Sequence, residues 1–270
     1  MTRRLRRALL AAVLGIAVGV AGTAVPAGAA PRPADAARLQ AVGGFDWASL
    51  AVSVALTVLG GGSSGDIDAA VQRIIAAVEQ SRTDILNHID AIAAADVQAC
   101  ARQHTIEFAD INNMSRTVEQ LWAQDATRCA TLATAYLNAV QSQAAADTIG
   151  LLIGEIYAIA MAARAKGGFG VNLLLQDEIS SYHTVITKLE PSCVEHKISE
   201  YDSRGRVVTT EIQYTCTAYN GDIGYDSEDY YRGKRTSPPL DREAVKDTAT
   251  RNTSRAVAKA ALPGLEAVLP

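Results

Sequence analysis

The feature that most constrains the fold of this chain is a long apolar-striped segment, residues 66–140, with one cysteine in each half. In its first half, large aliphatic residues recur at steps of three, four or seven, which keeps side chains on one side of a helix. They are Ile67, Val71, Ile74, Val78, Ile85, Ile89 and Ile92. The second half, interrupted by Asp125, repeats the pattern with Val118, Trp122, Cys129, Leu132, Tyr136 and Val140. The segment therefore predicts two long antiparallel helices packed along these stripes.

The first of these helices is expected to be continuous, because residues 66–111 contain neither proline nor glycine. At 1.5 Å per residue it would be about 65–70 Å long. A polar, turn-prone cluster at 112–117 then reverses the chain, and residues 115–143 return beside the first helix. This arrangement predicts an elongated antiparallel helical bundle.

The four cysteines predict two local disulfide bonds. Cys100 and Cys129 are placed symmetrically about the first turn, so that reversal brings them level across a helical hairpin. Cys193 and Cys216 are symmetrical about a two-residue turn at 204–205, and directly opposed strand residues lie within disulfide reach. Zinc binding is the alternative, but the spacing C-x-x-C that favours it is absent.

Three further helices are expected in the bundle. Residues 45–59 place serine or threonine at every fourth position and leave the other faces apolar, as in a buried helix; a strand is the alternative, because valines alternate there with small residues. Residues 147–165 form an apolar helix with a ridge of small residues, against which another backbone can pack closely. That ridge consists of Gly150, Gly154, Ala158 and Ala162. Residues 171–189 form the last helix, which Pro191 ends.

The C-terminal region, residues 191–270, has a different character. Residues 192–218 alternate and are rich in threonine, valine and tyrosine, which predicts a β-hairpin. Residues 220–239 are acidic and rich in tyrosine, and we expect them to form an irregular loop. Residues 240–262 predict a terminal helix. The predicted fold class is therefore mainly α, with a helical bundle at 45–190 followed by the β-hairpin, the acidic loop and the terminal helix.

Residues 1–30 are expected to be a secretory signal peptide. Four arginines precede an apolar run and a small-residue cleavage site, Ala27-Gly28-Ala29. The pair Arg6-Arg7 also fits a twin-arginine signal loosely, so the general secretory and the twin-arginine routes both stay open. An uncleaved membrane anchor is the alternative, but the apolar run is short for a membrane span. Residues 31–44, rich in proline, alanine and glycine, then form a flexible linker.

The charge of the mature chain bears on its partners. Cleavage removes four arginines and no acid, which leaves 21 basic against 29 acidic residues and a net charge of −8. Phosphate binding needs a positive surface, so nucleic acid is not expected as a partner. Arginine outnumbers lysine 19 to 6, which together with the abundant alanine is typical of a GC-rich bacterial genome. Four cysteines favour an oxidising compartment, and we expect a secreted, extracellular protein.

No catalytic, cofactor or metal site is predicted. Residues 61–65 match the serine-hydrolase pattern G-x-S-x-G, but that motif follows a core strand and its surroundings here are helical. Residues 220–229 resemble a calcium loop in composition without its register, so a solvated acidic loop is favoured. None of the histidines stands in a metal-binding spacing; they are His88, His104, His183 and His196.

Three classes of function follow. The leading prediction is a secreted, non-enzymatic structural or interaction protein whose partner is an unidentified protein or cell surface. The alternative is a membrane-active protein similar in architecture to α-helical pore-forming toxins, because apolar helices at 45–59 and 147–165 accompany long helical hairpins. Each is shorter than the ~20 residues that span a bilayer, and Glu155 lies inside the second, so core helices are favoured. An enzyme ranks third and would need a cleft in which histidines or buried carboxylates converge.

Overall fold

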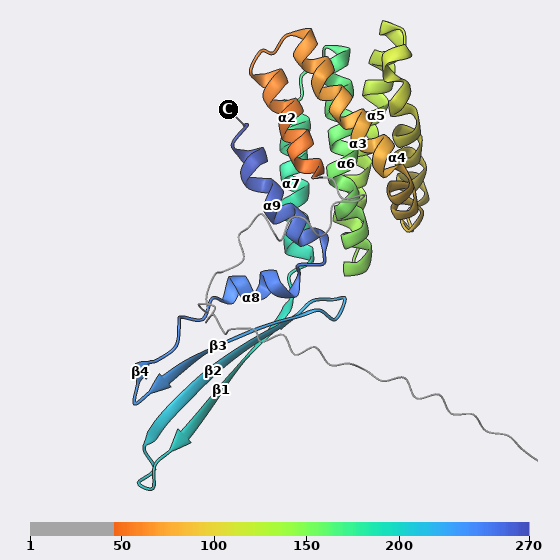
Figure 1. Ribbon diagram of the computed structural model, residues 1–270. Coiled ribbons are helices and arrows are strands. Elements are labelled where there is room, and N and C mark those ends of the chain that lie inside the picture. The colour runs from red at the N-terminus through yellow and green to blue at the C-terminus, as the bar shows by residue number, and fades with distance from the viewer. Residues whose placement is uncertain (1–45, 270) are drawn as a thin grey trace, which may run out of the picture. The chain divides into compact units, whose positions relative to one another are not determined.

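The computed structural model describes residues 46–269, all within one compact unit. The predicted signal peptide (1–30) and linker (31–44) lie outside the described residues. Helices predominate, and a four-stranded antiparallel sheet lies toward the C-terminus. The predicted mainly α fold class is thereby confirmed (Figure 1).

The helical bundle is built around α6. Its helices are α2 (Trp47–Leu59), α3 (Ser64–Asp90), α4 (Ala95–Glu107), the 3-10 helix η3 (Phe108–Asn113), α5 (Arg116–Ala139), α6 (Gln143–Gly167), α7 (Asn172–Lys188) and α9 (Ser254–Glu266). Helix α6 packs against α2, α3, α5, α7 and α9 (Figure 1). A Cβ added to Gly150 would overlap Ser254 of α9 and press on Val185 of α7. The predicted ridge of small residues thus allows two neighbours to approach the α6 backbone.

The prediction of one continuous helix over residues 66–111 is wrong, because the chain turns at 91–94 between α3 and α4. Helix α3 packs on α2 and α6, whereas α4 packs on α5. No proline or glycine marks this break. It coincides with full or nearly full burial of Ile89, Ile92 and Val97, and burying each such side chain stabilises the fold by about 1.5–3 kcal/mol. That gain outweighs the few helical hydrogen bonds lost, each of which contributes about 1 kcal/mol.

Helices α4 and α5 form a hairpin about the predicted reversal at 112–117. Cys100 and Cys129 are joined across it, with their Cα atoms 5.7 Å apart. Asp125, which interrupts the apolar stripe of α5, lies with its Oδ2 3.4 Å from Nε2 of the fully buried His104. The interruption thus places a carboxylate beside a buried imidazole. The hydrogen bond of this imidazole is made by Nδ1 with the Cys100 carbonyl oxygen, while Nε2 has no hydrogen-bond partner among the described residues.

The other two bundle helices predicted between residues 45 and 190 are also present. Residues 47–59 form helix α2 and not the alternative strand, and Asp46 caps it by accepting a hydrogen bond from the backbone N–H of Ser49. Helix α7 follows the predicted segment 171–189 closely, with Leu174, Leu175, Ile179 and Tyr182 buried. Both helices therefore present an apolar face to the core, as amphipathic helices of a soluble bundle do.

The sheet consists of β1 (Ser192–Tyr201), β2 (Val207–Thr217), β3 (Ile223–Tyr231) and β4 (Lys234–Arg235), in that spatial order. Cys193 lies directly opposite Cys216 and is bonded to it, with the Cα atoms 4.0 Å apart. The connecting turn is longer than the predicted two residues, because the backbone of Asp202 pairs with that of Arg206. A β-bulge next to Glu200 adds one residue to β2. The bulge offsets the longer turn, so the register at the cysteines is the one predicted.

The irregular acidic loop expected at 220–239 is instead largely strand, since residues 223–231 form β3 and 234–235 form β4. The segment lacks an apolar alternation because neither of its faces meets a large core. Backbone pairing with β2 and one close contact hold it in place. A Cβ added to Gly224 would overlap backbone atoms of Val245, so the glycine allows a helix to lie directly on the strand.

The single terminal helix predicted at 240–262 is instead two helices, α8 (Arg242–Ala249) and α9. Helix α8 lies on the sheet, and α9 rejoins the bundle beside α2, α6 and α7 (Figure 1). The break is stabilised by hydroxyls: Oγ1 of Thr253 donates to the Thr250 carbonyl at 2.8 Å. The backbone N–H of Ser254 donates to Oδ1 of Asp147 at 2.5 Å. That acceptor lies in α6, far along the chain. Thr253, however, is also the N-cap of α9 and accepts from the Arg255 backbone N–H, a local signal that sequence reasoning missed.

Candidate functional site

Among residues 46–269, a helix covers one face of the sheet and no element covers the other. Helix α8 packs on β2 and β3, where Cys193, Cys216, Leu240 and Val245 belong to a small separate core. Because successive side chains in a strand point to opposite faces, the alternate residues form what we call the open face. It consists of Ser192, Val194, His196, Ile198 and Glu200 of β1; Thr209, Glu211, Gln213, Thr215 and Thr217 of β2; and Ile223, Tyr225, Ser227, Asp229 and Tyr231 of β3.

The open face carries large apolar side chains in contact with solvent. Val194 and Ile198 are 51% and 48% exposed, and Ile223, Tyr225 and Tyr231 are 57%, 54% and 48% exposed. Single exposed apolar residues are ordinary, whereas a group of them on one surface marks an interaction site. Val194 and Tyr225 lie in the same row, on either side of Thr215. These side chains lie in four rows of the sheet, and the polar row of His196, Gln213 and Ser227 lies between them. The open face therefore mixes exposed apolar and polar side chains.

The strand positions of the open face carry only acidic charged residues, although Cζ of Arg232 lies 5.3 Å from the ring centroid of Tyr231 at its end. Glu200, Glu211 and Asp229 lie on this face, and its register positions hold no lysine or arginine. Glu211 lies directly opposite Asp229, a pairing of like charges that destabilises a sheet. Glu200, Glu211 and Asp229 line one hollow of about 370 Å³, together with Ile198 and Tyr231. A cationic group placed there would relieve the repulsion between the carboxylates.

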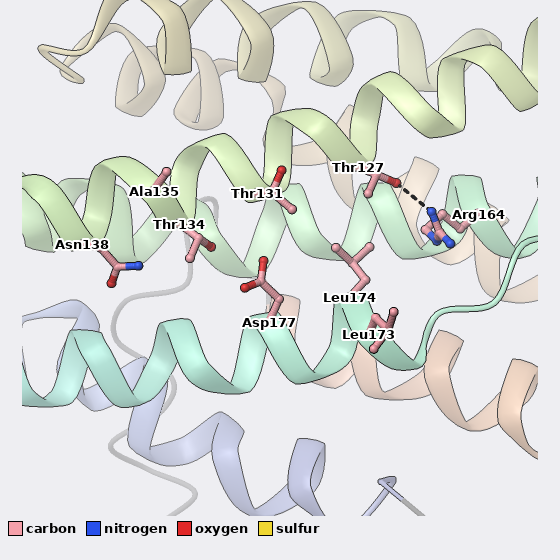
Figure 2. Close-up of a pocket in the computed structure, with 9 residues that line it drawn as sticks. All are labelled: Thr127, Thr131, Thr134, Ala135, Asn138, Arg164, Leu173, Leu174 and Asp177. Atoms are coloured by element: carbon pink, nitrogen blue, oxygen red, sulfur yellow. Dashed lines mark hydrogen bonds between the residues drawn. The ribbon is translucent and has the colours of Figure 1, made fainter.

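A second candidate is a groove of about 540 Å³ between α5 and α7. Figure 2 shows its lining side chains: Thr127, Thr131, Thr134, Ala135 and Asn138 from α5; Leu173, Leu174 and Asp177 from α7; and Arg164 from α6. Polar residues at 127, 131, 134 and 138 follow the spacing of one helical face. That spacing was visible in the sequence, and sequence reasoning missed it.

The charged groups of this groove are already held by partners within the protein. Arg164 donates from Nε to the Gly170 carbonyl at 2.7 Å and from Nη1 to Thr127 at 3.3 Å (Figure 2). Asp177 accepts a short hydrogen bond from the Tyr157 hydroxyl, which also pairs with Thr134 at 2.6 Å. Burial, and next the bond to Asp177, raise the pKa of Tyr157. These groups brace α5, α6 and α7, so we take the open face as the candidate site.

The structure separates the histidines that it describes. His104 is buried between α4 and α5, where its Nδ1 lies 2.7 Å from the Cys100 carbonyl oxygen. His183 lies on α7 with its Nε2 3.1 Å from Glu266, and His196 is exposed on the open face. The side chain of His88 lies outside the described set. The described histidines therefore do not share one site.

The side chains of the acidic segment 220–229 have partners within the protein. Among the side chains that the structure describes, there is no group of three His, Cys, Asp or Glu that could hold a metal ion. Asp222 is bonded to Asn252 at 2.7 Å, and Glu228 accepts from the Leu240 backbone N–H at 3.2 Å. The serine pattern at 61–65 lies between α2 and α3 without a strand before it, so the context of a hydrolase elbow is lacking.

Sequence reasoning did not find two fully buried carboxyl groups. Glu155 of α6 accepts a hydrogen bond from Oγ1 of Thr105 at 2.8 Å, and burial raises its pKa to about 8. Neither carboxyl oxygen of Glu178 in α7 has a hydrogen-bond partner, and burial raises its pKa well above the usual value. Neither residue lines the groove or the open face. Their main effect is therefore on stability.

No known family model matches this sequence, and no curated protein or solved structure is significantly similar to it.

Proposed function

We propose that this is a secreted, non-enzymatic interaction protein that binds a protein partner through the open face of its sheet. The observation that carries the proposal is the group of exposed apolar side chains on that face, Val194, Ile198, Ile223, Tyr225 and Tyr231. Aromatic side chains are enriched in protein interfaces. The helical bundle serves as the scaffold that holds this surface.

Charge defines the chemistry of the partner. The strand positions of the open face carry Glu200, Glu211 and Asp229 and neither lysine nor arginine. A partner that offers apolar side chains together with lysine or arginine fits this surface, because opposite charges steer association and set specificity. The proposed partner is therefore a basic, partly apolar surface on another extracellular protein or on a cell-surface protein.

Two disulfide bonds support the location, since such bonds form and persist in oxidising environments. The proposed route to that environment is export directed by residues 1–30, which are then cleaved off. The bonds lock the α4–α5 hairpin and the β1–β2 hairpin separately. Each of the two supersecondary units is thus stabilised by its own crosslink.

The open-face proposal predicts that three substitutions on β3 abolish partner capture. The immobilised mature chain is exposed to culture medium and cell-surface extract of the producing organism, and retained proteins are quantified by mass spectrometry. At least one protein should bind the wild type and fall at least about tenfold with Ile223→Thr, Tyr225→Thr and Tyr231→Thr combined. Threonine keeps the β propensity of the strand. Retention should also weaken with added salt, because charges at the rim are screened.

The matched control removes apolar surface elsewhere. Leu121 and Leu173 are 62% and 81% exposed on α5 and α7, and glutamine keeps their helix propensity. The combined Leu121→Gln and Leu173→Gln variant should retain the same protein. If this control loses the partner while the β3 variant keeps it, binding occurs at the groove and the proposal is wrong. The proposal is equally wrong if no retained protein depends on the open face.

A membrane-active function is the second candidate, because α6 is 25 residues long and apolar enough to cross a membrane. The structure thus lengthens the 19-residue helix predicted at 147–165. Burial raises the pKa of Glu155 to about 8, so this residue is largely neutral at pH 7, which weakens the objection that its charge would oppose insertion. However, 78% of the apolar window of α6 is buried inside the bundle, as in the core helix of a soluble protein.

Dye release from liposomes tests this second candidate. We expect the mature protein to release no trapped dye from anionic or neutral liposomes, because α6 would have to leave the helices packed around it before it could insert. A signal-peptide-free chain with both disulfides intact is required, and detergent lysis serves as the positive control. Leakage that depends on protein concentration would favour the membrane-active function over the interaction protein.

A further inference from the structure

The two edges of the sheet differ. On one side, β4 pairs with β3, and the backbone N–H of Thr236 donates to the Asp229 carbonyl at 2.8 Å. On the other side lies β1, ten residues long. Among the described hydrogen bonds, none joins the outer edge of β1 to another element of residues 46–269. A strand of this length with a free edge is a template for pairing with another strand.

The side chains of β1 are complementary to a second copy of themselves. When two β1 strands are placed antiparallel with His196 opposite its counterpart, Glu195 of each copy lies opposite Lys197 of the other. In the same register, Val194 lies opposite Ile198. Each of these pairs occurs twice because of the two-fold symmetry. Opposite charges and apolar pairs at directly opposed positions both stabilise a sheet.

Neighbouring registers do not have this property. A two-fold axis perpendicular to the sheet keeps each face on its own side, so the next allowed centres are Glu195 and Lys197. Centring on either residue places two like charges directly opposite each other, which is destabilising. A lysine in an edge strand ordinarily discourages pairing, but at position 197 it meets a carboxylate only in the register centred on His196.

Glu195 remains able to accept this second cation. Arg242 bonds to its Oε2 alone, at 2.7 Å from Nη2 and 3.1 Å from Nε. Among the described contacts Oε1 has no partner, and the side chain is 44% exposed. The other carboxylate oxygen is therefore open to Lys197 of a second copy.

We propose that two copies of this chain associate through their β1 edges, antiparallel and centred on His196, so that two four-stranded sheets become one continuous sheet. The two-fold axis places both open faces on the same side of the joined sheet. The dimer and the proposed partner share Val194 and Ile198, but the dimer is tested on β1 and the partner on β3. Failure of one proposal can therefore be distinguished from failure of the other.

A cysteine scan of β1 tests the register. Directly opposed residues of antiparallel strands have Cα atoms about 4.5–5.5 Å apart, within disulfide reach. The His196→Cys variant should therefore form a disulfide-linked dimer under mild oxidation. The single variants Val194→Cys and Ile198→Cys should not, because each residue then lies several residues from its own counterpart. Mixing those two variants should restore the crosslink, since 194 and 198 lie opposite each other.

Non-reducing gels and peptide mass mapping provide the measurement, with the Cys193–Cys216 bond verified as intact. Equal crosslinking of all three single variants would indicate random collision and would overturn the proposal. Absence of a dimer for His196→Cys would do the same, because the two edges would then not meet at this residue.

Light scattering of the protein without introduced cysteines measures its molar mass and gives a second, independent test. The wild type should show the mass of a dimer that dissociates on dilution. Lys197→Glu should weaken association by about tenfold or more, because two attractive pairs become two repulsive ones. Lys234→Glu, the same charge change on β4 at the opposite edge, should leave the mass unchanged. A wild type that is monomeric at every concentration, or equal effects of the two variants, would contradict edge pairing.

Discussion

The free energy of unfolding is expected to fall by roughly 4 kcal/mol as the pH rises from about 4.5 to about 8, because of Glu155 alone. Burial raises the pKa of this carboxyl from 4.5 to about 8 in the folded protein. In the unfolded chain it loses its proton near the ordinary value. The stabilising contribution of the protonated form is therefore fully present below about pH 4.5 and is lost as the pH approaches 8.

Glu178 should act in the same direction, because burial without any hydrogen-bond partner raises its pKa as well. Carboxylates held by hydrogen-bond donors act in the opposite sense at lower pH. The Leu240 backbone N–H, followed by the Tyr230 hydroxyl, lowers the pKa of Glu228 below 4.5, so its contribution is lost as the pH falls below that range. Stability should therefore be greatest in mildly acidic solution.

Urea unfolding of the oxidised protein between pH 4 and pH 8.5 measures this effect. The Glu155→Gln variant should be about as stable as the wild type at pH 4.5 and several kcal/mol more stable at pH 8, because glutamine stays neutral and can still accept from Thr105. Glu79→Gln, at an exposed position on α3, is the matched control and should leave the pH dependence unchanged. A wild type whose stability is flat or rises over this interval would contradict the assignment.

Removing the Cys100–Cys129 bond by replacing both residues with alanine is expected to destabilise the protein by about 3–4 kcal/mol. The bond closes a segment of 29 residues, so its loss frees the unfolded chain to sample many more conformations. Cys129 is also nearly fully buried in the bundle, so part of the loss arises from poorer packing between α4 and α5. The measurement is again urea unfolding. It is made at pH 5, where the folded protein keeps most of the stability that protonated Glu155 contributes.

The combined Cys193→Ala and Cys216→Ala variant is the control that shows which part of the protein each disulfide stabilises. The native bond closes a segment of 23 residues, and its removal should lower amide protection in β1, β2 and α8 while α4 and α5 keep theirs. The Cys100 and Cys129 variant should show the reverse pattern. Non-reducing peptide maps of the wild type must recover the two local links. A crossed pattern, or a loss below about 1 kcal/mol, would show that the hairpin does not depend on its crosslink.

Symmetry about a turn explains why the sequence was informative about the hairpins. Two cysteines equidistant from a polar, turn-prone cluster indicate where the chain reverses. At the β1–β2 hairpin the predicted pairing of Cys193 with Cys216 is confirmed, although the turn is longer than predicted. There, the bulge beside Glu200 compensates for the extra loop residue. The helical stripe likewise identified α5 as a helix, but its inward face only in part. Trp122 and Cys129 are buried, whereas Val118 is 49% exposed. The rest of the buried face is mostly alanine, together with Leu137.

The two breaks in the predicted helices have different causes. Neither proline nor glycine separates α3 from α4. The N-terminus of α9 has a local cap in Thr253 and a distant acceptor in Asp147, 107 residues earlier. The strand β3 was missed for a different reason. Its residues alternate between a solvent-facing surface and the close approach of α8 at Gly224, so the apolar periodicity on which strand prediction depends is absent.

The candidate site could not be predicted from the sequence, because the exposure of its residues depends on contacts between distant parts of the chain. Whether Val194, Ile198 and Tyr225 are buried depends on which face of the sheet α8 covers. Helix α8 lies on β2 and β3 with its Val245 backbone against Gly224, a contact between segments that are separate in the sequence. Conversely, the polar face of α5 was readable, and the structure shows that its groups brace helices to one another.

Because α9 packs against α2, the earliest and latest helices of the described chain are neighbours. During synthesis, α2 must therefore wait for residue 266 before its final contacts can form, and contacts between such distant parts of a chain form slowly. The bundle cannot be completed until α9 has left the ribosome, so the chain stays incompletely folded during most of its translation. If the chain is exported, as proposed above, this order of events suits a translocation channel that accepts unfolded chains.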